Sequence, residues 1–272
     1  MILIIIAAIV GFICWSCRKI HYTAPTGEAY NLFLDMLKQP HLLIAGATGS
    51  GKSVTLNGLI ATALYRLPFE SHERGAQFIL IDPKKVSLAK YKTLPHTIAY
   101  ADTHESIIQA MRKAESIMDA RYAEMQRKGQ ADFTGADLYI MIDEVMDLMT
   151  TPATKKQFAP VLQRICQLGR AAKVHAVVCT QCPLREVIPT PIKCNIDARL
   201  CLRTENDQDS RNIMRRSGAE LLPNPRTAGK AQGYYKNGPE ITLYNLPRVP
   251  QEEIDGLIAW WKDQKRKNHL AA

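Results

Sequence analysis

The sequence predicts a doubly wound α/β fold with a mostly parallel sheet, and three observations lead to this prediction. Short apolar runs recur along the chain, each long enough for one buried strand. Segments with helical periodicity separate these runs, as in successive β–α–β units. Residues 46–53 follow one run directly and match G-x-x-x-x-G-K-[ST], the pattern of a phosphate-binding loop between a strand and a helix.

Five apolar runs are the expected parallel strands. Such strands are buried on both faces, so they read as continuous apolar segments rather than as an alternating pattern. The runs are residues 42–45, 78–81, 138–142, 174–179 and 198–202.

Helical periodicity and turn signals define the remaining elements. The longest helix is expected over residues 103–128, because its apolar residues share one face and Gly129 follows as a stop signal. A second helix is expected over residues 160–172, with Leu162, Ile165 and Leu168 among its inward residues. An antiparallel hairpin is expected around Asn237-Gly238.

The chain opens with an uncharged apolar run that begins at Ile2 and ends at Cys17. Its length is near the lower limit for a transmembrane helix, and Arg18 and Lys19 follow at once. This positive flank predicts a single-pass anchor with the rest of the chain at the inner face of the cytoplasmic membrane. A buried core helix is the alternative interpretation of the run.

The predicted organisation has four parts. These are a transmembrane anchor at residues 1–19, a juxtamembrane segment at 20–39, a P-loop ATPase domain at 40–247 and a basic amphipathic tail at 248–272.

Composition adds two constraints. The formal net charge of +9 favours a polyanionic partner such as nucleic acid, although a solvated basic surface would give the same excess. The seven cysteines are an odd number, and Cys179 and Cys182 form one C-x-x-C without a second pair or histidines at zinc spacing. We therefore expect reduced thiols and no metal site among the cysteines.

The phosphate-binding loop predicts binding of a nucleoside triphosphate such as ATP. Its glycines let backbone N–H groups turn inward, at a helix N-terminus that also favours negative charge. Lys52 would reach the β- and γ-phosphates, and the Ser53 hydroxyl would hold Mg²⁺. The predicted nucleotide-binding residues are Gly46, Ala47, Thr48, Gly49, Ser50, Gly51, Lys52 and Ser53.

Hydrolysis also needs groups that act on the metal ion and on water. Asp143 and Glu144 end the run at residues 138–142, where Asp143 would support Mg²⁺ and Glu144 would polarise the attacking water. Gln181 follows the next run and could contact the γ-phosphate or that water, or belong to an ordinary turn. Arg170 could act across a subunit boundary as an arginine finger or be a solvated surface residue, and Arg211 is a weaker candidate for the same role.

Taken together, these residues resemble the FtsK/SpoIIIE family of membrane-anchored, ATP-driven DNA translocases. Seven ordered matches carry the resemblance: residues 40–54, Ile81-Asp-Pro-Lys84, Asp143-Glu144 with residues 147–149, residues 169–172, Thr180-Gln181, residues 209–211 and residues 218–220.

The resemblance implies a RecA-like motor domain that uses ATP and Mg²⁺. It also implies a homo-oligomer, a hexameric ring around double-stranded DNA, in which Lys52, Ser53, Asp143 and Glu144 take the roles given above. Arg170 matches the arginine that the family presents to the nucleotide of a neighbouring subunit.

The chain departs from the family pattern in several respects. We expect one membrane span instead of several, no additional ring-forming domain before the motor and no C-terminal winged-helix module. Thr180-Gln-Cys-Pro183 also stands where the family has Thr-Gln-Arg-Pro. These departures favour a compact relative encoded by a mobile element or a phage over a chromosome-segregation protein.

Other functions stay open at this point. The same chemistry would serve a coupling ATPase for conjugative DNA transfer or protein secretion. A membrane scaffold that hydrolyses ATP slowly is a further alternative, disfavoured by the intact Asp143-Glu144 pair. A small-molecule kinase is disfavoured because Asp143-Glu144 and Thr180-Gln181 suit attack by water.

Overall fold

A computed structural model describes residues 28–66, 75–184 and 187–270. The predicted membrane anchor at residues 2–17 lies outside these ranges, as does the first part of the predicted juxtamembrane segment. Within the described ranges, no helix is both long and apolar enough to cross a membrane.

In the described part of the chain, eight strands form one sheet in the order β3-β2-β4-β5-β1-β6-β7-β8. The pairs from β3 to β6 are parallel, and β7 and β8 are antiparallel additions at one edge. The strands are β1 (His41–Ala45), β2 (Ala76–Ile81), β3 (Thr97–Ala101), β4 (Asp137–Ile142), β5 (Val174–Thr180), β6 (Ala198–Leu202), β7 (Ala231–Asn237) and β8 (Glu240–Leu246). The five predicted parallel strands and the hairpin at Asn237-Gly238 are confirmed, whereas β3 was not predicted.

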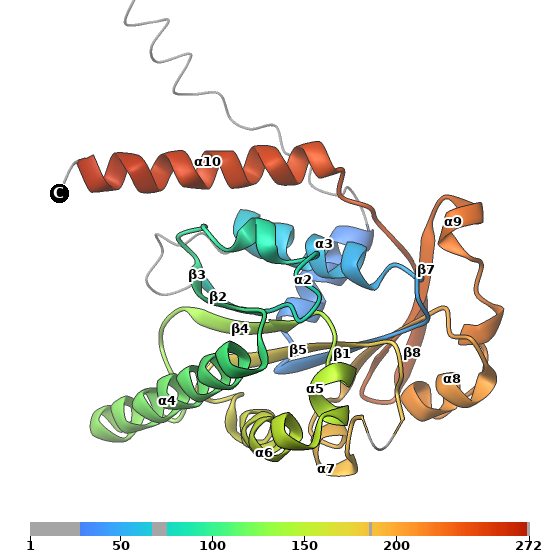
Figure 1. The fold of residues 1–272 in the computed structure, drawn as a ribbon, viewed down its shortest axis with the longest axis horizontal. Helices are drawn as coiled ribbons and strands as arrows, with labels where there is room; N and C mark the ends of the chain where they lie inside the picture. Colours follow the sequence, from blue (N-terminus) through green and yellow to red (C-terminus); the bar gives the residue numbers. More distant parts are fainter. Residues whose placement is uncertain (1–27, 67–74, 185–186, 271–272) are drawn as a thin grey trace, which may run out of the picture.

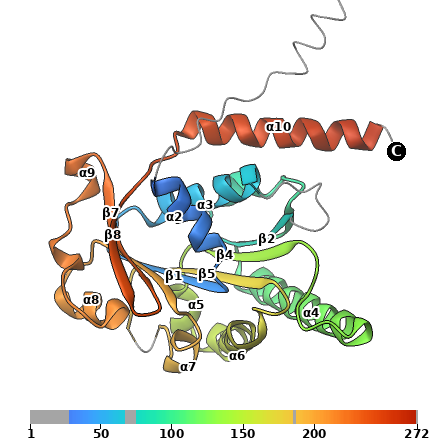
Figure 2. The ribbon, with the colours of Figure 1, turned by 180° about the vertical axis from the view of Figure 1, so that it is seen from behind.

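Helices cover both faces of this sheet (Figure 1). In two opposite views, α2, α3 and α10 lie on one side of the sheet and α4, α5 and α6 on the other (Figure 2). The helices are α2 (Glu28–Leu37), α3 (Lys52–Arg66), α4 (His104–Lys128), α5 (Met146–Thr150), α6 (Pro152–Leu168), α7 (Thr190–Lys193), α8 (Asp207–Met214), α9 (Pro225–Ala228) and α10 (Gln251–Leu270), with single 3₁₀ turns at η1 (Ala89–Tyr91) and η2 (Ala219–Leu221).

Alternate side chains of the parallel strands pack into two separate hydrophobic cores, one on each face of the sheet. In β1, Leu42 and Ile44 belong to the core under α2, α3 and α10, and Leu43 and Ala45 belong to the core under α4 and α6. Burial on both faces explains why these strands read as continuous apolar runs.

The segments that flank the predicted ATPase domain contribute to the first core. Phe33 of α2 and Trp261 of α10 are buried in the same cluster as Leu56 of α3. The predicted domain boundaries at residues 39 and 248 stay a prediction. Both α2 and α10, which lie outside these boundaries, pack on the same core as the sheet.

The helix that precedes β5 differs from the prediction. It runs from Pro152 to Leu168, so its expected span of residues 160–172 was wrong at both ends. Proline suits the first helical turn, and Pro152 occupies that position, whereas Pro160 lies inside the helix. Leu168, expected to face inward, is 41% exposed in the last turn.

Candidate nucleotide site

The phosphate-binding loop leaves the carboxyl end of β1 and leads into α3. β1 pairs with β5 on one side and with β6 on the other, so the loop lies near the middle of the carboxyl edge of the sheet. Ligands of open α/β sheets bind at this edge. Both neighbouring strands hold the loop, because Gly46 N–H donates to the Thr180 carbonyl at 3.3 Å and Ala47 N–H donates to the Arg203 carbonyl at 2.7 Å.

Three glycines of the loop are required by its geometry. Gly49 and Gly51 have φ values of 77° and 109°, in the region that favours glycine. At Gly46 a Cβ atom would lie 2.8 Å from the Cβ of Leu202, so no side chain fits there. The backbone can therefore turn tightly and approach a bound phosphate group.

Lys52 is buried within the loop. Its ammonium donates to the carbonyl oxygens of Gly46 at 2.7 Å and Ala47 at 2.9 Å. Burial lowers the pKa of Lys52, an effect opposed by the negative charges of Glu144 and Asp143. Within the described residues no carboxylate forms an ion pair with this ammonium, so it is suited to bind the oxygens of a polyphosphate.

Ser53 and Asp143 meet at the start of α3. The Ser53 hydroxyl donates to Asp143 Oδ1 at 3.3 Å, and the Ser87 hydroxyl lies 3.3 Å from that of Ser53. The pKa of Asp143 is raised, mainly by burial and further by the nearby charge of Asp82, while hydrogen bonds from Ser87 and Ser53 act in the opposite direction.

These oxygen atoms fit Mg²⁺, a hard cation that takes oxygen ligands and keeps several waters. Within the described residues, no group of three or more His, Cys, Asp or Glu side chains could hold a metal ion. A metal ion held by Ser53 and Asp143 would therefore need further ligands, and phosphate oxygens of a nucleotide would supply them.

Glu144 is fixed by the backbone on two sides. Its Oε1 accepts hydrogen bonds from Met146 N–H at 3.2 Å and from Gln181 N–H at 3.3 Å. Its Oε2 lies 3.5 Å from the ammonium of Lys84, and the Glu144 side chain is only 3% exposed. Gln181 in turn accepts a hydrogen bond from the Thr48 hydroxyl at 2.9 Å, which joins the end of β5 to the phosphate-binding loop.

A pocket of about 370 Å³ opens beside these groups. It is lined by Thr48, Gly49, Gly51, Lys52, Ser53, Val54, Lys84, Val86, Ser87, Asp143 and Gln181. Of the residues predicted from the sequence to act on the metal ion or water, Ser53, Asp143 and Gln181 line this pocket. Glu144 is adjacent but does not line it, because its carboxylate is buried behind the ion pair with Lys84.

The two candidate arginines lie elsewhere. Arg170 lines a pocket of about 460 Å³ together with Asp137 and His175, at the amino edge of the sheet where β4 and β5 begin. The structure therefore does not bring Arg170 to the phosphate-binding loop of its own chain. Arg211 pairs with Asp207 at 2.8 Å and donates to the Ser217 hydroxyl at 2.8 Å, so it is held next to its own helix.

Sequence reasoning left the roles of several site residues open. Ile81-Asp-Pro-Lys84 was noted as a motif, but its role depends on β2 lying next to β4. Asp82 is fully buried, and its Oδ2 accepts a hydrogen bond from Leu88 N–H at 2.8 Å. This bond closes the turn that brings Lys84 to Glu144 and Ser87 to Ser53.

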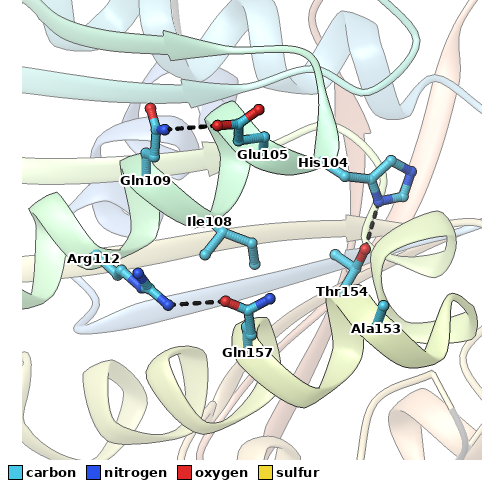
Figure 3. A pocket seen from close by; sticks show the side chains of 8 residues that line it. All are labelled: His104, Glu105, Ile108, Gln109, Arg112, Ala153, Thr154 and Gln157. Carbon is cyan, nitrogen blue, oxygen red and sulfur yellow. Dashed lines mark hydrogen bonds between the residues drawn. The ribbon is translucent and has the colours of Figure 1, made fainter.

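A third pocket, of about 350 Å³, lies between α4 and α6 (Figure 3). His104 Nδ1 lies 2.6 Å from the Thr154 hydroxyl, and Arg112 donates to Gln157 Oε1 at 2.9 Å. The polar groups of this pocket thus pair with one another and join the two helices. We interpret the pocket as part of the helix packing and not as a nucleotide site.

Comparisons with known proteins identify the family of this chain. A family model, FtsK/SpoIIIE family, matches residues 24–234. "DNA translocase FtsK" of Caulobacter vibrioides is 31% identical to this chain over an alignment that covers 90% of this chain and 34% of the relative. "DNA translocase FtsK" of Listeria monocytogenes is 36% identical, with coverage of 72% and 28%. "DNA translocase SpoIIIE" of Bacillus subtilis is 35% identical, with coverage of 72% and 27%. The chain spans about a third or less of the length of these relatives.

Solved structures share the fold. The pCW3 conjugation coupling protein TcpA with ATPγS has a TM-score of 0.70 at 20% identity, with coverage of 83% of this chain and 66% of that chain. The cytoplasmic domain of the Thermomonospora curvata type VII secretion ATPase EccC has a TM-score of 0.67 at 24% identity, with coverage of 82% and 28%. At these identities the likeness concerns the α/β fold alone.

Proposed function

This chain belongs to the FtsK/SpoIIIE family, and we propose that it hydrolyses ATP and uses the free energy to move along double-stranded DNA. One observation supports this proposal above the others: Lys52, Ser53 and Asp143 converge on one pocket at the phosphate-binding loop, with Glu144 beside it. This arrangement has a group for each task of phosphoryl transfer to water.

In the proposed reaction, the phosphate-binding loop and the Lys52 ammonium hold the β- and γ-phosphates. Mg²⁺ held by Ser53 and Asp143 would neutralise negative charge on the phosphates. Glu144 accepts a proton from the water that attacks the γ-phosphorus, and the bond to ADP breaks. In this structure the Glu144 carboxylate is paired with the ammonium of Lys84, which itself lines the pocket.

We propose that the active assembly is a hexameric ring. Arg170 supports this because it lies at the amino edge of the sheet, opposite the loop of its own chain. In a ring, this edge of one subunit could face the nucleotide of the next, and Arg170 would then stabilise charge on the transferred phosphoryl group.

We further propose double-stranded DNA as the substrate of the motor. The net charge of +9 favours a polyanion, and the relatives that match are named DNA translocases. We place the motor at the inner face of the cytoplasmic membrane, with residues 2–17 as its anchor, on the basis of their apolar composition.

A triplex-displacement assay tests the proposal, because a motor that moves along a duplex removes a third strand bound ahead of it. The full chain with ATP and Mg²⁺ is expected to release the third strand, and the rate is expected to fall as salt rises. Lys52→Ala is the matched control and should release none. ATP hydrolysis without strand release by the wild-type chain would favour a coupling ATPase for conjugation or secretion. Very slow turnover under every condition would favour a scaffold.

A further inference from the structure

Arg226 of α9 lies against the phosphate-binding loop, although it is far from the loop in sequence. A Cβ atom built on Gly49 would lie 2.9 Å from Arg226 Nε and 3.1 Å from both Cζ and Nη2. Three atoms of the planar guanidinium are thus almost equally distant from this point, so the face of the group is turned towards Gly49. The absence of a side chain at Gly49 leaves room for this contact.

α9 is a single turn whose position is fixed at both ends. The Asn224 side chain accepts a hydrogen bond from Arg226 N–H at 3.1 Å, and Gly229 ends the turn with a φ of 71°. The start of β7 also touches the loop, because a Cβ atom on Gly51 would lie 3.1 Å from the Cβ of Ala231. The segment that carries Arg226 is therefore held against the phosphate-binding loop from two points.

The guanidinium of Arg226 has no ion-pair or hydrogen-bond partner within the described part of the chain. Only the backbone N–H of Arg226 donates there, to Asn224. The N–H donors of a guanidinium lie in its plane, so packing of its face on Gly49 leaves its edge free for an acceptor. A polyphosphate in the loop would be the nearest strong acceptor, and arginine binds phosphate with paired hydrogen bonds.

We propose that Arg226 is a nucleotide-binding residue that acts within its own chain, where its guanidinium binds the polyphosphate of ATP from the Gly49 side of the loop. This inference rests on the proposed function, because it requires that the loop bind ATP. It assigns to α9 a role separate from that of Arg170, which lies at the opposite edge of the sheet.

DNA phosphates are the other polyanion that an exposed arginine could bind. The contact with Gly49 favours the nucleotide, because Gly49 belongs to the loop and lines its pocket. Lys230, just after α9, is an exposed cation on the same segment and provides a matched control for loss of charge.

The test measures the affinity of the full 272-residue chain for a fluorescent mant-ATPγS with Mg²⁺, which avoids turnover. Arg226→Ala is expected to raise the dissociation constant about tenfold, whereas Arg226→Lys, which keeps the charge, should raise it less. Lys230→Ala should change it less than about twofold. The affinity of Arg226→Ala should also depend less on salt than that of the wild type, because one ionic contact is lost.

Each remaining outcome would overturn the inference in a recognisable way. Equal affinities of Arg226→Ala and Lys230→Ala for mant-ATPγS would show that Arg226 contributes no more to nucleotide binding than an exposed lysine. An equal loss of affinity for mant-adenosine would place the contact on the base instead of the polyphosphate. Weaker duplex DNA binding by Arg226→Ala with unchanged nucleotide affinity would assign the residue to DNA. Failure of the wild-type chain to bind the nucleotide at all would instead refute the proposed function on which the inference rests.

Discussion

Replacement of Glu144 by glutamine separates nucleotide binding from hydrolysis. The amide has almost the same volume as the carboxylate, and its oxygen can still accept the hydrogen bonds from Met146 N–H and Gln181 N–H. Its amino group would face the ammonium of Lys84, so the ion pair is lost. The amide cannot accept a proton from water. We therefore predict that Glu144→Gln binds ATP normally but hydrolyses it very slowly.

The size of the effect of Glu144→Gln on stability and on the rate of hydrolysis can be estimated from the structure. The Lys84 side chain is 42% exposed and can turn into solvent, so loss of its pair with Glu144 should cost about 1 kcal/mol of stability or less. Loss of a general base lowers the rate by roughly 10²- to 10⁴-fold, equivalent to about 3–5 kcal/mol of activation free energy. The kinetic effect should therefore greatly exceed the effect on folding.

Phosphate release at saturating ATP measures the rate, and mant-ATPγS binding measures the affinity. The predicted result is a decrease in kcat of at least about 100-fold with a dissociation constant within about twofold of the wild-type value. Lys84→Met is the matched control, because it breaks the same ion pair and keeps the carboxylate. A decrease in kcat below about tenfold for Glu144→Gln would refute the assignment of Glu144 as the base.

Three further predictions concern stability. Asp143→Asn should melt at a higher temperature than the wild type at pH 7 without Mg²⁺. Burial raises the pKa of Asp143, so its ionised form opposes folding above that pKa, and the gain should shrink as the pH falls through it. Gly129→Ala should lower the free energy of unfolding by about 1 kcal/mol, because Gly129 ends α4 with a φ of 64°. Gly256→Ala, inside α10 with open space around it, should raise that free energy, and a decrease for both variants would contradict the reasoning. Phe33→Ala should cost about 3–5 kcal/mol in chemical denaturation, because the ring is fully buried against Gly58. A cost below about 1 kcal/mol would show that α2 is not part of the folded core.

Features with local causes were predictable from the sequence. The strand before Gly46 and the helix after Lys52 follow from the phosphate-binding loop pattern, and α4 follows from its apolar face and its stop at Gly129. Thr103 caps the other end of α4 by accepting a hydrogen bond from Ser106 N–H. These signals lie within a few residues of the structure that they specify.

Features that depend on distant contacts were not predictable. β3 was missed because Thr97–Ala101 is short and partly buried at the edge of the sheet, without a clear alternating pattern. The pairing of Lys84 with Glu144 depends on the neighbouring positions of β2 and β4. The contact of Arg226 with Gly49 depends on how the segment before β7 returns across the loop. In each case the residues were visible in the sequence, but their partners were set by the order of the strands.

The ATPase rate of the full chain with and without duplex DNA tests the central claim most directly. A DNA motor should hydrolyse ATP faster when duplex DNA is present, and the stimulation should decrease steeply as the salt concentration rises, because phosphate contacts release counterions. Glu144→Gln should show no such stimulation. Equal rates with and without duplex DNA at low salt, from a wild-type chain that binds ATP, would contradict the claim that this ATPase acts on DNA.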